Sequence, residues 1–214
     1  EGSAEKPGKP MPPSTGRTAE ILRVLRTHGL CPATQNPVRA AFAYGSGVFR
    51  QAGDDDNHGV RTQPSAPTAR MLDVLLIADS PEAWHAANLA ANRSHYSSLG
   101  SLGAPRVAQF GAIGPGVYFN ANVPLHDATA PWRRLKYGVA STDAFVEDLT
   151  EWRWLYLAGR LQKPVLDLLE TGGGGPRGVG DETDDRDALV ASARRRNRDA
   201  ALAAARLVLG AHAA

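Results

Sequence analysis

The spacing of apolar residues along the chain predicts alternating helices and strands. Short runs of apolar, β-branched and aromatic residues are typical of strands, and stripes that repeat every three or four residues are typical of helices. In chain order the pattern predicts a helix at 18–28, strands at 41–44 and 71–79, a helix at 81–96, strands at 117–119 and 135–140, and helices at 142–161 and about 186–209. This order indicates an α/β (α+β) protein, with a mixed sheet flanked by helices and a C-terminal helical extension.

Segments poor in apolar residues separate these elements and suggest the domain limits. Residues 1–16, rich in Pro, Gly and Lys, are expected to be disordered. The main domain is predicted to cover 17–168, with a polar loop at 52–70. Residues 171–187 contain four consecutive glycines and are expected to form a flexible linker before a last helix in 188–214.

Composition narrows the classes of partner. The net charge of +2 is too small to indicate a nucleic-acid partner, and none is expected. The single cysteine excludes an internal disulfide. No apolar run approaches the roughly 20 residues that a transmembrane helix needs, so a peripheral membrane contact is the closest one predicted.

The strand at 41–44 leads into Gly45-Ser46-Gly47, which is the first candidate for chemistry. Glycines at a turn let a ligand approach the main chain, and free amides beside the Ser46 hydroxyl form a cradle for anions. The pattern predicts that this turn opens a helix. A simple turn without a ligand is the alternative.

The strand at 71–79 is almost continuously apolar, which makes Asp73 unusual. A buried carboxylate needs a partner, a metal ion or a raised pKa. Asp79, followed by Ser80, Pro81 and Glu82, is predicted to cap the next helix.

The helix at 81–96 carries a polar stripe, and the strand at 135–140 carries a lysine. His85, Asn88, Asn92 and His95 are spaced to share one face. Such a stripe predicts either contact with a polar ligand or buried polar links within the protein. Lys136 likewise either is a solvated edge residue or contacts a phosphate.

The predicted helix at 142–161 has a wide apolar stripe and a basic end. Its stripe consists of Phe145, Leu149, Trp152 and Tyr156. Arg160 and Lys163 lie at its C-terminal end, where cations complement the helix dipole and could also meet phosphate.

A strand, a Gly-Ser turn and a second strand that carries an acid form the arrangement that nucleotidyl transfer requires. Backbone amides hold the terminal phosphates, and the strand carboxylate holds Mg²⁺. Nucleotidyltransferases commonly place two acids two residues apart on that strand. Here Asp73 occupies the first of these positions, but Leu75 occupies the second.

The motifs in detail resemble those of one family, the mitochondrial phosphatidate cytidylyltransferases, also called mitochondrial translocator assembly and maintenance proteins. The resemblance covers roughly residues 20–165, in the order of the family. Its main pieces are Tyr44-Gly45-Ser46-Gly47-Val48-Phe49-Arg50-Gln51, Met71-Leu72-Asp73, Asn92-Arg93-Ser94-His95-Tyr96-Ser97, Leu135-Lys136-Tyr137-Gly138-Val139 and Leu155-Tyr156-Leu157-Ala158-Gly159-Arg160-Leu161-Gln162-Lys163-Pro164-Val165.

The resemblance implies transfer of CMP from CTP to phosphatidic acid, with Mg²⁺, on the matrix side of the mitochondrial inner membrane. It implies a peripheral enzyme that supplies CDP-diacylglycerol for cardiolipin synthesis. The implied site residues are Gly45, Ser46, Gly47 and Lys136 for phosphate, Asp73 and Asp148 for metal, Asn92, Ser94, His95 and Tyr96 for the nucleotide or head group, and Arg160 and Lys163 for phosphate near the membrane. For Asp148 an ordinary surface position is the alternative.

Two further hypotheses stay open at this stage. One is a nucleotidyltransferase with another acceptor, and the other is a non-enzymatic maintenance factor for the mitochondrial import machinery. Family members continue into a winged-helix-like module beyond the region that matches Leu209, so we expect this chain to be truncated there. Homo-oligomer formation is left open by the sequence.

Overall fold

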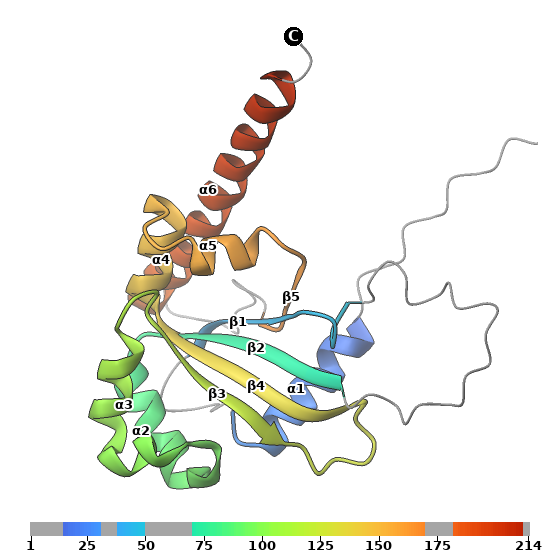
Figure 1. The fold of residues 1–214 in the computed structure, drawn as a ribbon, viewed down its shortest axis with the longest axis vertical. Coiled ribbons are helices and arrows are strands. Elements are labelled where there is room, and N and C mark those ends of the chain that lie inside the picture. The colour runs from blue at the N-terminus through green and yellow to red at the C-terminus, as the bar shows by residue number, and fades with distance from the viewer. Residues whose placement is uncertain (1–14, 31–37, 50–69, 170–181, 212–214) are drawn as a thin grey trace, which may run out of the picture.

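The computed structural model describes residues 15–30, 38–49, 70–169 and 182–211. Within these residues helices surround one five-stranded sheet (Figure 1). The elements are α1 Thr15–Thr27, β1 Val38–Tyr44, β2 Arg70–Ala78, α2 Pro81–Ala91, η1 Arg93–His95, η2 Ser98–Leu102, α3 Gly103–Gly111, β3 Val117–Pro124, β4 Trp132–Ser141, α4 Thr142–Glu151, α5 Tyr156–Leu161, β5 Val165–Asp167 and α6 Glu182–Ala211.

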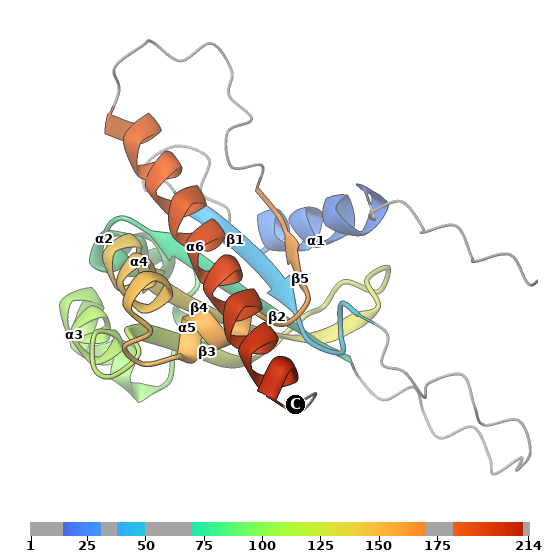
Figure 2. The same ribbon diagram turned by 90° about the horizontal axis from the view of Figure 1, so that it is seen from above.

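The strands form a mixed sheet in the order β3-β4-β2-β1-β5. β2 and β4 are parallel, and the other neighbouring pairs are antiparallel. The two ribbon views place α1 on one face of the sheet and α4, α5 and α6 on the other (Figures 1 and 2). The predicted α/β class, with a mixed sheet and a C-terminal helix, is confirmed.

Each face of the sheet has its own core. Leu72, Val74 and Leu76 of β2 pack with α1, while Leu75 and Ile77 pack with α4 and α6. Because side chains alternate along a strand, Asp73 lies on the second of these faces. The prediction that β2 is covered on both sides is therefore confirmed.

The polar helix is shorter than its pattern predicts. α2 ends at Ala91, Asn92 caps its C-terminus, and residues 93–95 form a 3-10 turn. The segment 97–116 contains η2 and α3, which the small and Gly-rich composition did not predict. β5 was also missed, because three residues are too few to show a period.

The predicted helix at 142–161 is two helices in the structure. The chain breaks after α4, where Trp152 has φ 53° and Leu155 has φ 57°. The apolar stripe therefore holds for Phe145 and Leu149, while Trp152 lies in the break and Tyr156 begins α5.

Three local predictions are corrected. Gly45–Phe49 forms a turn, and no helix begins within residues 45–49, the described residues that directly follow β1. Ser80, rather than Asp79, caps α2, since its hydroxyl accepts from the amide of Ala83. Residues 182–187 of the predicted linker belong to α6.

Other predictions fall on segments outside the described residues. These are residues 1–14 of the segment predicted to be disordered, nearly all of the loop at 52–70, and the linker up to residue 181. Residues 15–16 of the first segment belong to α1 instead. Among the helices that are described, none has both the length and the apolar character needed to cross a membrane.

Candidate active site

The candidate active site forms where β1 ends and β2 begins, beneath α5. Asp73 is in register with Tyr44 of β1 on one side and with Lys136 of β4 on the other. Cross-strand partners present their side chains to the same face, so an acid and a base lie next to each other on the sheet. The structure thus brings together Asp73 and Lys136, which are 63 positions apart in the sequence.

The Gly-Ser-Gly turn lies directly against this acid. Gly45 has φ +82°, and a Cβ added there would come within 3.2 Å of Asp73 Oδ2. Gly47 packs so closely on β2 that a Cβ would overlap the carbonyl oxygen of Met71. The carbonyl of Gly47 also accepts a hydrogen bond from Trp132 Nε1 at 2.8 Å. Both glycines are therefore required by close approach of the backbone.

The turn leaves donors available to a ligand. The amides of Val48 and Phe49 donate to the carbonyl oxygen of Gly45 at 3.1 and 3.0 Å. Across the described part of the chain, the amides of Ser46 and Gly47 have no hydrogen-bond partner; Ser46 is exposed and Gly47 is buried. Consecutive unpaired amides at a turn can form a concave site for anions, so this geometry supports the anion cradle, which stays a prediction.

Burial and the neighbouring charges act in opposite directions on the pKa of Asp73. Burial raises the pKa of the Asp73 carboxyl, and the nearby charges of Lys136 and Arg160 partly offset that effect. Burial and then Asp73 raise the pKa of Tyr44 to about 12. Tyr44 is therefore a neutral hydrogen-bonding group beside the acid at physiological pH.

Aromatic rings position both cations. The guanidinium of Arg160 lies 4.3 Å from the centroid of the Tyr44 ring, and Lys136 Nζ lies 4.8 Å from that of Phe119. Tyr44 and Phe119 were not predicted as parts of the site. The signal was present for Tyr44, because period-two alternation in β1 places it on the same face as Phe42.

A cavity of about 250 Å³ opens beside the turn. Gly45, Ser46, Arg160 and Lys163 are among the residues that line it. The unpaired amide of Ser46 and two cations in one cavity favour an anionic ligand. The structure therefore brings both predicted basic residues of the α5 region to the Gly-Ser turn.

The polar stripe of α2 does not join this site. Asn92 donates to the carbonyl oxygen of His28 and to Asn88 Oδ1, both at 2.9 Å. His95 Nδ1 lies 3.0 Å from the hydroxyl of Tyr137, whose strand neighbour Lys136 points to the opposite face.

The other residues of the Asn92–Tyr96 motif also lie away from the candidate active site. The buried hydroxyl of Tyr96 bonds to His85 and Asn88, and Ser94 is exposed. The geometry of the stripe thus matches the alternative of buried polar links. A contact of these residues with a nucleotide or head group stays a prediction.

Asp148 has a structural role in this fold. Its carboxylate is 1% exposed and accepts four hydrogen bonds, from the amides of Trp154, Leu155, Leu157 and Ala158. Because those bonds occupy both oxygens, we correct the prediction that Asp148 holds a metal ion. It caps the N-terminus of α5 instead.

The fit to Mg²⁺ rests on Asp73. No group of three or more His, Cys, Asp or Glu side chains in the described segments is arranged to hold a metal ion. Mg²⁺ commonly needs only one or two protein carboxylates, because substrate phosphates and water complete its shell. A half-buried acid beside a phosphate-type turn fits that mode of binding.

Comparison with known proteins decides the family. A family model described as "Phosphatidate cytidylyltransferase, mitochondrial" matches residues 29–213. The chain belongs to this family. The match includes β1 with its turn, Asp73, Lys136 and α5, so the whole candidate site lies inside it.

Individual relatives support the same family assignment. The chain is 46% identical over 138 residues to mitochondrial phosphatidate cytidylyltransferase from Danio rerio, which is 64% of this chain and 37% of that protein. The corresponding protein of Saccharomyces cerevisiae is 42% identical over 139 residues, covering 64% of this chain and 32% of the relative. The chain thus spans about a third of the length of the curated relatives that it matches.

Proposed function

We propose that this protein is a Mg²⁺-dependent phosphatidate cytidylyltransferase. It transfers CMP from CTP to phosphatidic acid and releases pyrophosphate, giving CDP-diacylglycerol for cardiolipin and phosphatidylglycerol synthesis. The observation that carries the proposal is the contact of the Gly45–Gly47 turn with Asp73, beside Lys136 and Arg160, in a chain of this family.

In this proposal the turn binds the nucleotide. The free amides of Ser46 and Gly47, with the Ser46 hydroxyl, hold the terminal phosphates of CTP. Lys136 neutralises charge on the phosphate chain from the neighbouring strand. Such preorganised donors and charges lower the barrier because they need no rearrangement during the reaction.

Asp73 is the proposed metal ligand. Mg²⁺ bound there supplies neutralisation of the charge that builds on the α-phosphoryl group and on the leaving pyrophosphate. Its double charge, together with Lys136 and Arg160, also favours the ionised form of a carboxyl whose pKa burial raises. The Asp73 carboxyl is therefore expected to be ionised when nucleotide and metal are both bound.

Arg160 and Lys163 are proposed to meet the second substrate. They line the same cavity as Gly45 and Ser46, so a lipid phosphate bound by them would lie next to the turn. An oxygen of that phosphate attacks the α-phosphorus of CTP, and the bond to pyrophosphate breaks. The relatives are named as mitochondrial, which supports a mitochondrial location. Peripheral attachment to the matrix side of the inner membrane is part of the proposal.

The direct test is product formation. Labelled CTP, Mg²⁺ and vesicles containing phosphatidic acid should yield labelled CDP-diacylglycerol, and vesicles without phosphatidic acid should not. Absence of product under conditions where the Danio rerio relative is active would contradict the proposal for this chain.

The nucleotide is tested by binding. CTP should raise the thermal midpoint of the protein more than UTP, ATP or GTP at equal concentration, because at a given concentration a tighter ligand stabilises the folded state more. Equal shifts for all four nucleotides would favour a transferase with a different specificity.

A further inference from the structure

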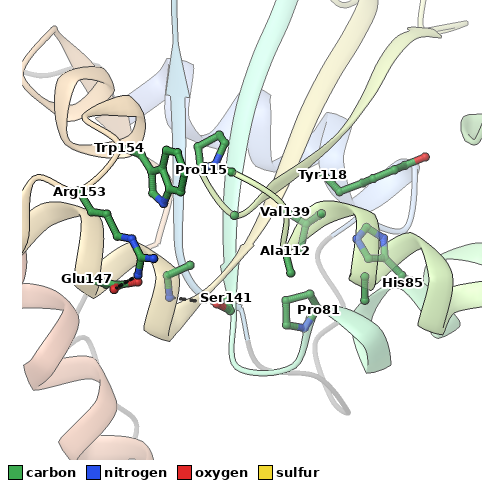
Figure 3. Close-up of a pocket in the computed structure, with 15 residues that line it drawn as sticks. Pro81, His85, Ala112, Pro115, Tyr118, Val139, Ser141, Glu147, Arg153 and Trp154 are labelled. Carbon is green, nitrogen blue, oxygen red and sulfur yellow. Dashed lines mark hydrogen bonds and ion pairs between the residues drawn. The ribbon is translucent and has the colours of Figure 1, made fainter.

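A second cavity lies at the far end of β4 from Lys136. It has a volume of about 220 Å³ and is enclosed by the end of β4, the start of α2, the α3–β3 connection and α4 (Figure 3). Lys136 precedes Ser141 by five positions, which is about 16 Å along a strand. This cavity is therefore separate from the candidate active site.

The inner wall of the cavity carries a buried group without a partner. His85 is 0% exposed, and in the described part of the structure its Nε2 has no hydrogen-bond partner. The imidazole ring points into the cavity, toward Ala112 and Val139 (Figure 3). Buried polar atoms without partners are rare in native proteins, so this atom calls for an explanation.

The surrounding network favours the tautomer in which this nitrogen is a donor. The hydroxyl of Tyr96 accepts from Asn88 Nδ2 at 2.9 Å and lies 2.8 Å from His85 Nδ1. The Tyr96 proton is therefore free to be donated to His85 Nδ1, which leaves the hydrogen of the neutral ring on Nε2. Burial lowers the pKa of His85 to about 4, so the ring is neutral at physiological pH.

The mouth of the cavity has no net charge. Arg153 donates to Glu147 Oε1 at 2.6 Å, and both side chains line the opening. Trp154 lies beside them and is 51% exposed. The paired charges favour neither an anion nor a cation, and phosphate would meet the carboxylate of Glu147.

The rim is held in an unusual backbone conformation. Trp152 and Leu155, which flank Arg153 and Trp154, both have positive φ although neither is glycine. Such strained residues concentrate at binding and catalytic segments. Here the strain positions an exposed tryptophan over a cavity.

We propose that this cavity binds a small neutral molecule with an apolar or aromatic body and one hydrogen-bond acceptor, such as a carbonyl. The acceptor takes the proton of His85 Nε2 at the inner wall. The body packs against Tyr118 and the small apolar side chains, and Trp154 covers it. A cavity of about 150 Å³ is enough to take up benzene, so a one-ring ligand fits.

Two soluble probes test the acceptor. Acetophenone has a ring and a carbonyl, whereas toluene has the ring alone. Titration followed by amide NMR should shift Gly114, Gly116 and Ala144, with acetophenone binding about 3- to 10-fold more tightly, as one hydrogen bond predicts. Equal affinities for the two probes, or shifts elsewhere only, would overturn the proposal.

Matched variants test the location. Ala144→Leu fills the cavity without removing a hydrogen bond and should abolish the shifts, whereas Ala200→Leu on the exposed side of α6 should leave them unchanged. His85→Phe, if folded by circular dichroism, should make the two probes bind equally. Unaltered acetophenone binding by Ala144→Leu would place the ligand elsewhere and contradict the proposal, whatever the outcome of the CTP experiments.

Discussion

At the scale of single residues, the site depends on an acid that the fold stabilises poorly. Burial works against the charge of Asp73, and Lys136 and Arg160 only partly compensate. Functional sites often carry such a cost, because a group suited to a ligand is not the one that best suits the empty protein. Metal and nucleotide would remove that cost by supplying positive charge.

Replacing Asp73 should therefore separate activity from stability. We expect Asp73→Asn to lower cytidylyl transfer by more than about 100-fold, because it removes the proposed metal ligand and its charge. A carboxyl with a raised pKa in the folded state costs stability above that pKa. The variant should therefore unfold at the same or a higher temperature than the parent at pH 7, and the difference should shrink at lower pH.

Circular dichroism melts from pH 4 to pH 8 and the transfer assay check this prediction. Unchanged transfer by Asp73→Asn would remove Asp73 from the mechanism. A variant less stable at pH 7 than at pH 4, relative to the parent, would contradict the assigned effect of burial.

Substitution of Gly45 should have two separable effects, one from its backbone conformation and one from its contact with Asp73. A left-handed conformation costs a residue with a Cβ about 1–2 kcal/mol, and at Gly45 the Cβ would also press on Asp73. Gly114 has a similar φ, +66°, with nothing within 4 Å of an added Cβ.

We expect both Gly45→Ala and Gly114→Ala to lose about 1–2 kcal/mol in urea unfolding. Only Gly45→Ala should also weaken CTP binding, measured by calorimetry, because it displaces the acid and the turn. Equal CTP affinity in the two variants would show that close approach to Asp73 is not needed.

At the scale of elements, the break between α4 and α5 shapes the site. A continuous helix from 142 to 161 would carry Arg160 away along the axis of α4. Instead Asp148 gathers four amides of the next segment and starts α5 over the end of β1. This turn of the chain brings Arg160 onto Tyr44.

Removing the charge of this cap should destabilise the protein. Asp148→Asn keeps the size of the side chain but leaves one oxygen for four donors, and we expect a loss of about 2–3 kcal/mol, in line with bonds to charged groups. Asp143→Asn is the matched control on the same helix, since the Asp143 side chain is 83% exposed and its contact with Arg186 is at 3.7 Å. Urea unfolding of both variants is the measurement, and similar losses in both would contradict the capping role.

At the scale of the whole molecule, one acid ties the C-terminal helix to the sheet. Asp79, at the end of β2, accepts from Arg39 of β1 at 2.7 Å and from Thr142 of α4 at 2.8 Å. Arg186 of α6 lies 3.3 Å from Oδ1, the oxygen that also accepts from Thr142. Segments more than 100 positions apart therefore meet at one carboxylate.

This acid predicts a dependence of stability on pH. Burial raises the pKa of Asp79, but hydrogen bonds from Arg39 and Thr142 outweigh it, so the pKa lies below its usual value. The stabilisation is complete above the unfolded value of about 3.9 and is lost as pH falls through the lower, folded value.

Asp79→Asn should accordingly be less stable than the parent at pH 7 and pH 5, and the difference should be smaller at pH 3. Urea unfolding at the three pH values provides the measurement. A constant difference across this range would show that the charge of Asp79 does not couple β2 to α6.

The sequence by itself determined the class of the fold, most of its elements and the identity of the turn and acid. β2 and the start of α2 are set by local pattern, because a near-continuous apolar run is typical of a strand buried on both faces and a spacing of three to four residues is typical of a helix. The Gly-Ser-Gly motif and Asp73 could likewise be found from the chain, since glycine before a polar residue and a charge in an apolar strand are local anomalies.

Tertiary structure alone decided which residues share the site. Strand pairing places Lys136, rather than Tyr137 with its polar network, on the same face of the sheet as Asp73. The role of Asp148 depended on a chain break that needs four amides to converge, which no period encodes. Local sequence sets what a segment can form, whereas contacts between distant segments set which of its groups are buried, paired or free to bind.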